Sequence, residues 1–511
     1  MKKFTKRENF IVRFIAGMIA AVLLFADITI AARAEDLPYD TYTYDYWENV
    51  VYTPAAYVPG NIIYGQQFMY QGESIGAFVS PQDMCKSEDG LVYVADTGNN
   101  RIVILNQTMT EVTDIIDGFV NEGAQDGFQS PTGVCVNSDN HLYIADSINR
   151  RIVILDLNNN NELIKIVDNP TSEILDPGFV FTPLKVSVDY AGRIYCIAQN
   201  MFEGIMVFEE NGEFTGFFGT IEVKISLWEK FWKKLATKEE RAKSQLFIPT
   251  EFTGIDIDES GFVYATNIDS DGMQAVRRLN PKGEDVIRKG QNNNVGGDLW
   301  IDGSTSYAGP SQITDVVYRQ KGIYSLLDRR RGRIFTYDHE GNLLYIFGGM
   351  GSQAGTFSAP VAIEYIGDKL VVLDSSRASI TCFDPTEYGT LINEAVALRY
   401  DGDETLAVEK WQEVLKLNEN LELANSGIGK AYLTAGDNLM AMHYLQLAMN
   451  REYYSIAYKR YRNEILGKNL KYVLSGILVF VIGFEVISKV VEVKEKRKKK
   501  DKSSKGGSAV G

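Results

Sequence analysis

The fold is decided by two stretches that read almost alike, LVYVADTGNNRIVIL at residues 91–105 and HLYIADSINRRIVIL at residues 141–155. Each holds two runs of β-branched, aliphatic and aromatic residues, the composition that favours β-strands, separated by a short polar turn. A Ser-Pro pair precedes each stretch, at residues 80–81 and 130–131. The two stretches therefore belong to a repeat with a period of about fifty residues.

Weaker copies of this unit follow along the chain. Each starts at a proline and has a turn between apolar runs, and the four starts are Pro183, Pro249, Pro310 and Pro360. Four short strands fit in one repeat, and four-stranded units in a radial array form a β-propeller, in which the repetition protects the sheet edges. We therefore predict a mainly β fold, a six-bladed propeller over residues 76–390, followed by helices.

The repeat resembles a known family in its wording. A Leu-Tyr-Val-Ala-Asp run, then an asparagine and an Arg-Ile pair, is similar to the NHL repeat, and the matching residues are Asp96, Asn99, Arg101, Asp146, Asn149 and Arg151. The resemblance implies the propeller fold, but it implies no single function, because propellers serve both binding and catalysis. We expect the repeated Asp and Arg residues to tie strand ends to turns.

The N-terminal region contains two different segments. Residues 1–34 have the basic start, apolar middle and small-residue cleavage site of a secretory signal peptide. Residues 35–75 are rich in tyrosine. Because the sequence becomes helical after the sixth unit, we expect part of 35–75 to supply the outer strand that closes the last blade. An aromatic surface for sugars is the alternative.

The C-terminal region predicts helices and a membrane anchor. Residues 391–468 contain Gly-Asp pairs at 402–403 and 436–437, and this spacing of 34 resembles the TPR repeat. Residues 469–491 are apolar and long enough to span a bilayer, and residues 492–511 form a basic tail. Since positive residues stay on the cytoplasmic side, we expect a single-pass cell-membrane protein with its propeller and helices outside and its tail in the cytoplasm.

The charge of the chain is unevenly distributed. The 511 residues carry a net charge of −15, whereas residues 1–34 carry +4 and residues 489–511 carry +6, so that the part between them carries −25. An acidic body of this size repels phosphate backbones, and this excludes nucleic acid as the main partner.

Three groups of residues are candidate sites. A basic cluster could hold an anionic polymer or a carboxylate, or be a solvated turn: Arg329, Arg330, Arg331 and Arg333. Asn267, Asp269 and Asp271 begin a stretch that resembles a calcium-binding loop, but its twelfth position is Arg278 instead of glutamate. An inserted amphipathic helix at 221–246 could dock on the propeller or contact an anionic membrane through Trp228, Phe231 and Trp232.

These observations favour a binding function. We predict a membrane-anchored extracytoplasmic binding or scaffold protein with a protein or polysaccharide partner. Two alternatives stay open: a propeller hydrolase of the gluconolactonase type acting on sugar-derived substrates, and an accessory subunit of an envelope transport or polysaccharide system. No catalytic residues are identified, an enzyme is the less favoured reading, and no cofactor is expected beyond the calcium candidate.

Overall fold

The computed structural model describes residues 37–175, 178–220, 251–269, 274–290, 295–299 and 309–505, without the side chains of 501–505. Several predicted features lie outside these residues: the signal peptide at 1–34, the inserted helix at 221–246 with Trp228, Phe231 and Trp232, and Asp271. The chain divides into two compact units, Met1–Gly402 and Asp403–Gly511.

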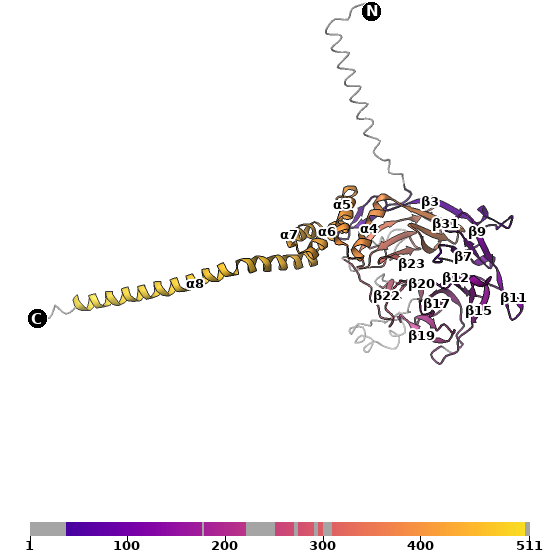
Figure 1. Ribbon diagram of the computed structural model, residues 1–511, viewed down its shortest axis with the longest axis horizontal. Coiled ribbons are helices and arrows are strands. Elements are labelled where there is room, and N and C mark those ends of the chain that lie inside the picture. Colours follow the sequence, from indigo (N-terminus) through magenta and orange to yellow (C-terminus); the bar gives the residue numbers. More distant parts are fainter. Residues whose placement is uncertain are drawn as a thin grey trace, which may run out of the picture. The chain divides into compact units, whose positions relative to one another are not determined.

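The first unit is a six-bladed β-propeller, as the repeat predicts (Figure 1). Each blade is an antiparallel sheet, and in blades 1 to 4 the strands follow one another in chain order. Blades 1 to 3 comprise β6 (Asp83–Lys86), β7 (Val92–Asp96), β8 (Arg101–Leu105) and β9 (Val112–Ile116); β12 (Pro131–Val136), β13 (His141–Asp146), β14 (Arg151–Asp156) and β15 (Glu162–Val167); and β16 (Pro183–Val188), β17 (Ile194–Ala198), β18 (Ile205–Phe208) and β19 (Phe214–Phe218).

Blades 4 to 6 follow the same plan. They comprise β20 (Phe252–Ile257), β21 (Val263–Asn267) and β22 (Val276–Leu279); β23 (Ile313–Gln320), β24 (Ile323–Asp328), β25 (Arg333–Tyr337) and β26 (Leu343–Phe347); and β29 (Pro360–Ile366), β30 (Lys369–Asp374) and β31 (Ser379–Pro385). Short hairpins and bridges join the blades: β4 (Met69–Tyr70) with β5 (Glu73–Ser74), β10 (Gly118–Asn121) with β11 (Ala124–Gly127), and β27 (Gly349–Met350) with β28 (Thr356–Phe357).

The middle strands are apolar on both faces because neighbouring blades cover them. In β8, Ile102, Val103 and Leu105 have no exposed surface, although successive side chains point to opposite faces. A short apolar run bounded by turns is the pattern of such a fully buried strand. The turns before β7 and β8 place Gly90 and Asn100 at positive φ, which these two residue types adopt more easily than others.

The inner strands close into a ring. Contacts join β6, β12, β16, β20, β23 and β29 in turn, and β29 meets β6 again. The sixth blade receives its outer strand from the N-terminal region. This strand, β3 (Tyr57–Tyr64), pairs antiparallel with β31 from Tyr57↔Pro385 to Tyr64↔Ser379. A strand from the N-terminal region thus completes the last blade and removes an open sheet edge.

The first part of the Tyr-rich segment adds a hairpin to blade 5, which the sequence does not predict. Strands β1 (Tyr42–Tyr44) and β2 (Val50–Tyr52) form a hairpin that extends blade 5 beyond β26, with Tyr42 opposite Ile346. Tyr42 and Tyr44 are buried there, whereas Trp47 and Tyr52 are exposed. The segment therefore contributes to two blades instead of one.

The helix α4 (Glu387–Tyr400) belongs to the first unit. It begins directly after β31, where the Thr386 hydroxyl accepts a hydrogen bond from the Gly389 amide as the N-cap. It contacts β24 and β31, and the Tyr345 hydroxyl donates to Asn393 Oδ1 over 2.8 Å. The predicted helical region at 391–468 therefore starts earlier, and its first helix is part of the propeller unit.

The second unit consists of helices. They are α5 (Glu404–Leu417), α6 (Glu422–Ala435), α7 (Asn438–Leu447) and α8 (Arg451–Lys505). Asp403 and Asp437 cap α5 and α7 in the same way, each accepting a hydrogen bond from the amide three residues later. A Cβ on Gly429 would lie 2.6 Å from Leu445 Cγ, so this glycine permits the close approach of α6 and α7.

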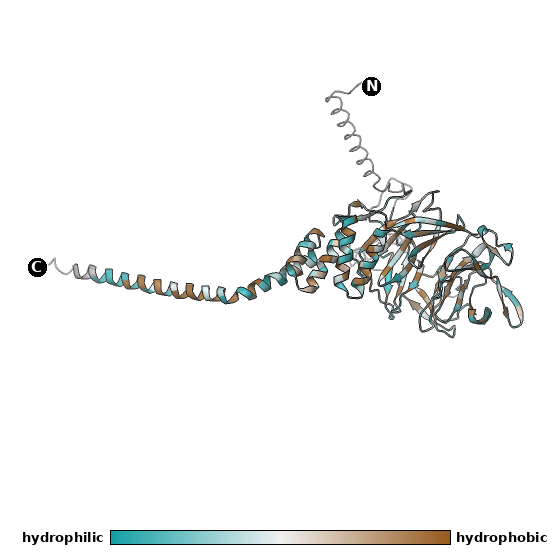
Figure 2. Ribbon diagram, turned by 45° about the horizontal axis from the view of Figure 1, so that its top comes forward, coloured by the Kyte–Doolittle hydropathy of each residue, from teal (hydrophilic) through white to brown (hydrophobic). Residues whose placement is uncertain are grey.

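The long helix α8 has an apolar section without any burial. Of the helices in the described residues, it is the one long and apolar enough to cross a membrane, and its most apolar stretch is not buried. Figure 2 shows this section in brown between more polar turns of the same helix.

Candidate functional site

Three charged side chains meet across the propeller axis. Asp83, Lys185 and Asp315 occupy equivalent positions on the inner strands of blades 1, 3 and 5. Lys185 Nζ lies 2.6 Å from Asp83 Oδ1 and 3.1 Å from Asp315 Oδ1, and the three side chains are 12, 6 and 6% exposed. The second oxygen of each aspartate accepts a backbone amide, from Val134 and Ile363 respectively. We call these three residues the axial triad.

The axial triad is a strongly coupled group. Burial is the main cause that raises the pKa of Asp315, to about 7, and the neighbouring Asp83 carboxylate adds to the shift. The two carboxylates also raise the pKa of Lys185 against the effect of its burial. Lys185 therefore stays charged, and it offsets the repulsion between two carboxylates that water does not screen.

A second layer of charge lies two or three residues further along the inner strands. Lys86 Nζ is 3.0 Å from Glu364 Oε1 and donates to the Tyr365 carbonyl over 2.9 Å. Asp256 accepts a hydrogen bond of 2.6 Å from the Tyr318 amide. Burial, and then the Glu364 charge, raises the pKa of Asp256 to about 7.

The Asp, Asn and Arg residues of the repeat form a hydrogen-bonded frame in blade 1. Asp96 Oδ2 accepts from Arg101 Nε and Asn99 Nδ2, both over 2.8 Å, and Asp96 Oδ1 accepts from the Val79 amide over 2.7 Å. Asp96 is fully buried. The frame ties the end of β7 to the start of β8 and to the connection that enters the blade, which is the structural role that the sequence predicts.

Blade 2 repeats this frame fifty residues later and adds one contact. Asp146 accepts from Arg151 Nε over 2.9 Å and from Asn149 Nδ2 over 2.8 Å. In addition, Arg151 Nη1 and Nη2 donate to the two oxygens of Asp126 over 2.7 and 2.9 Å. This fork of two hydrogen bonds is the strong form of an arginine–carboxylate pair, and it fills the space beside Arg151.

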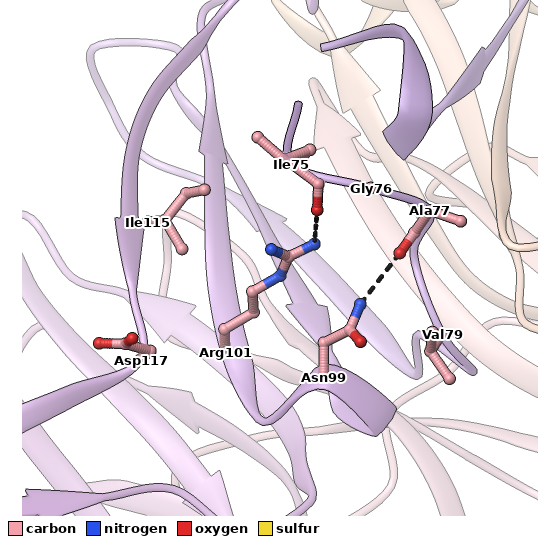
Figure 3. A pocket seen from close by; sticks show the side chains of 8 residues that line it. All are labelled: Ile75, Gly76, Ala77, Val79, Asn99, Arg101, Ile115 and Asp117. Atoms are coloured by element: carbon pink, nitrogen blue, oxygen red, sulfur yellow. Dashed lines mark hydrogen bonds between the residues drawn. The ribbon is translucent and has the colours of Figure 1, made fainter. Parts of the chain in front are cut away.

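The corresponding space in blade 1 is a pocket of about 530 Å³ (Figure 3). Its lining residues are Ile75, Gly76, Ala77, Val79, Asn99, Arg101, Ile115 and Asp117. Arg101 Nη2 donates to the Ile75 carbonyl over 2.8 Å and Asn99 Nδ2 to the Ala77 carbonyl over 3.0 Å. Figure 3 shows the Asp117 carboxylate turned away from the guanidinium group. We call this the Arg101 pocket.

The basic cluster predicted in blade 5 is engaged with the protein itself. Arg331 and Arg333 both pair with the buried Asp298, which also accepts hydrogen bonds from the hydroxyls of Tyr42 and Tyr44. The other two arginines reach backbone or amide oxygens: Arg330 Nη1 donates to the Pro310 carbonyl over 2.9 Å, and Arg329 Nε to Gln312 Oε1 over 3.4 Å. The cluster thus joins blade 5 to the β1–β2 hairpin.

Asn267 and Asp269 of the calcium candidate lie near one residue, Gln274. Asn267 Nδ2 donates to the Gln274 carbonyl over 3.0 Å, and Asp269 Oδ2 accepts from the Gln274 amide over 2.8 Å. Asp271 lies outside the described residues. Within the described residues, no three His, Cys, Asp or Glu side chains form a group that could hold a metal ion.

Comparison with known proteins identifies the repeat. The family model of the NHL repeat matches residues 78–105 and 128–155. The chain therefore carries NHL repeats in a six-bladed propeller. No curated protein matches the sequence.

Several solved structures match this chain at low similarity. A streptogramin B lyase is 11% identical with a TM-score of 0.38, and the match covers 65% of this chain and all of that one. Virginiamycin B lyase from Staphylococcus aureus is 9% identical with a TM-score of 0.39 and coverages of 64 and 99%. A protein of unknown function from Bacteroides thetaiotaomicron is 13% identical with a TM-score of 0.41 and coverages of 66 and 79%. Values this low carry no inference about activity.

Sequence reasoning missed both the axial triad and the Arg101 pocket. The triad joins residues more than a hundred positions apart, and no local pattern marks them. For the pocket, a signal was present in the aligned repeats: the fifty-residue offset places Gly76 where blade 2 has Asp126.

Proposed function

We propose that the chain is a membrane-anchored extracytoplasmic binding protein, in which the propeller and the helices hold a protein partner near the membrane. The single observation that carries this proposal is the unburied apolar section of α8. Among the large hydrophobic side chains of the described residues, those of this section are some of the most exposed, including Val479 at 69% and Phe480 at 75%. A surface of this size needs an apolar environment, and a bilayer supplies it.

The charges at the end of α8 support one orientation. Lys494, Lys496 and the run Arg497–Lys500 follow the apolar section directly. Lysine and arginine near the end of a span stay in the cytoplasm. The proposal therefore places the acidic propeller unit and the helices α5 to α7 on the other side of the membrane, and the basic tail inside.

The helices α5 to α8 support a binding role as a TPR-like pair of hairpins. The caps of α5 and α7 recur with a spacing of 34, and the buried positions Ala407 and Ala441 have the same spacing. Gly427 and Gly429 permit close approach of the paired helices, since a Cβ on Gly427 would lie 2.5 Å from Trp411 Nε1. TPR units offer a surface for a peptide or another domain, and this proposal gives these helices the same task.

The interior of the propeller also favours binding over catalysis at the axis. Asp83 and Asp315 are engaged by Lys185, and Glu364 is engaged by Lys86. These carboxylates thereby serve the stability of the ring. The Arg101 pocket, which is lined by residues of blade 1 and of the connection that leads into it, is an open polar site away from these carboxylates.

Membrane extraction tests the anchor. The full chain should remain in the membrane pellet after an alkaline carbonate wash. A variant with three lysines in the apolar section, V479K/F480K/I482K, should move to the soluble fraction, because each lysine near the middle of a span costs about 2.5–3.5 kcal/mol. The matched control L466K, at an exposed position earlier in the same helix, should stay in the pellet. Release of the wild-type chain by carbonate would overturn the proposal.

A further inference from the structure

An arginine begins the third strand of three blades, and two of these arginines bind a carboxylate from the connection that precedes their blade; for Arg151 it is a second carboxylate, beside Asp146. Arg151 in blade 2 holds Asp126, and Arg333 in blade 5 pairs with Asp298. Both aspartates come from the connection that leads into their blade. In this chain, an arginine at the start of a third strand thus binds a carboxylate in two blades.

Blade 1 lacks this carboxylate. Arg101 uses Nε for Asp96 and Nη2 for the Ile75 carbonyl, and within the described residues no hydrogen-bond partner or acid faces its Nη1. Gly76 stands at the position of Asp126, and a Cβ built on it would meet nothing within 4 Å. The space that a side chain fills in blade 2 is therefore open in blade 1, and Arg101 is partly exposed to it, at 15% of its side chain.

We propose that the Arg101 pocket binds a carboxylate on an aliphatic stem, the acidic side chain of a protein partner. Such a group would take the place that Asp126 has beside Arg151. This inference deepens the proposed binding function and rests on it for the partner.

The walls of the pocket favour an acidic side chain over a sugar acid as the ligand. Four lining side chains are apolar: Ile75, Ala77, Val79 and Ile115. An aliphatic stem packs against such walls, whereas the hydroxyls of a sugar acid would each lose water without gaining a partner. The net charge of −15, and Asp117 at the rim, disfavour ligands with several negative charges. A single carboxylate on an apolar stem fits both conditions.

Binding of a small probe to the purified full chain in detergent tests the proposal. The probe is N-acetyl-glutamic acid α-amide, which carries one carboxylate on an aliphatic stem, and its uncharged control is N-acetyl-glutamine amide. In calorimetric or NMR titrations at low salt, the acid should bind at one saturable site and at least tenfold more tightly than the amide. Galacturonate is the third ligand, and tighter binding of galacturonate would assign the pocket to an acidic polysaccharide and overturn the proposal.

Three variants place the binding in the pocket. G76D supplies an internal carboxylate and should abolish binding of the acid. Gly76 has a positive φ, which aspartate and asparagine adopt more easily than other non-glycine residues. R101K keeps the charge but loses the guanidinium edge, and it should weaken binding about tenfold. D126A vacates the equivalent place beside Arg151, and it should raise the stoichiometry from one to two.

The outcomes separate this inference from the proposed function. Equal affinity of the acid and the amide probe, or unchanged binding in both G76D and R101K, would overturn the carboxylate assignment. Neither result would touch the membrane anchor, which the carbonate wash tests on its own. A chain that is released by carbonate but still binds the acid would contradict the anchor and keep the pocket.

Discussion

Removing the charge of Lys185 should destabilise the propeller strongly. In K185M the side chain keeps its approximate length, but Asp83 and Asp315, each only 6% exposed, are left facing each other without a cation. Removal of one partner of a buried ion pair costs about 3–5 kcal/mol, because the remaining charge stays out of water. At roughly 2 °C per kcal/mol for a large domain, the unfolding midpoint should fall by about 6–10 °C at pH 8.

The assay is thermal unfolding of the full chain in detergent, followed by near-ultraviolet circular dichroism of the buried tyrosines. The matched control is K369M, which removes an ion pair with Asp384 whose side chains are 51 and 41% exposed. Exposed pairs contribute about 0–1 kcal/mol, so K369M should unfold within about 2 °C of the wild type.

The pH dependence and a compensating variant make the test specific. Below pH 6 the carboxylates of K185M can take up protons, so the difference between K185M and the wild type should shrink. D83N/K185M/D315N should recover much of the loss, since the asparagine oxygens can still accept the backbone amides of Val134 and Ile363. A K185M midpoint within 2 °C of K369M at pH 8 would refute the stabilising role of the axial triad.

Two further predictions concern Asp256 and the helices. The pKa of Asp256 rises from 3.8 to about 7 on folding. The folded state therefore binds more protons between these values, and the free energy of unfolding should fall as pH rises from 4 to 7. In D256N, urea titrations should show a shallower fall of this free energy with pH, and an unchanged slope would contradict the prediction. G427A should destabilise the helical unit by about 1–3 kcal/mol, because its Cβ would lie 2.5 Å from Trp411 Nε1. In G467A the Cβ meets nothing within 4 Å, so helical circular dichroism on heating should show no loss, and equal effects of the two changes would argue against the packing.

The propeller could be predicted because its blades repeat local signals. Each strand pair of blades 1 and 2 combines β-branched runs with a turn residue of positive φ, such as Gly90 or Asn100, and neither signal depends on distant residues. The caps Asp403 and Asp437 are similarly local. These elements follow from composition and spacing alone.

Contacts between distant segments could not be predicted in the same way. The pairing of Tyr42 with blade 5 depends on a buried aspartate, Asp298, that lies more than two hundred residues away. The sequence alone offers the basic cluster as a candidate anion site, because it does not show that Asp298 reaches Arg331 and Arg333. Charged residues take their roles from their partners, and the partners are set by the closed ring.

The most direct test of the central claim is the side of the membrane on which each end of the chain lies. A cysteine at Tyr52, which is 70% exposed on the propeller unit, and a cysteine at Lys498 in the basic tail are treated separately with a membrane-impermeant maleimide on intact cells. The wild type is the control, because Cys196 and Cys382 are buried and Cys85 and Cys135 are partly buried. Y52C should be labelled in intact cells, and K498C only after the membrane is opened. Labelling of K498C in intact cells, or protection of Y52C, would contradict a membrane-anchored protein with its propeller outside.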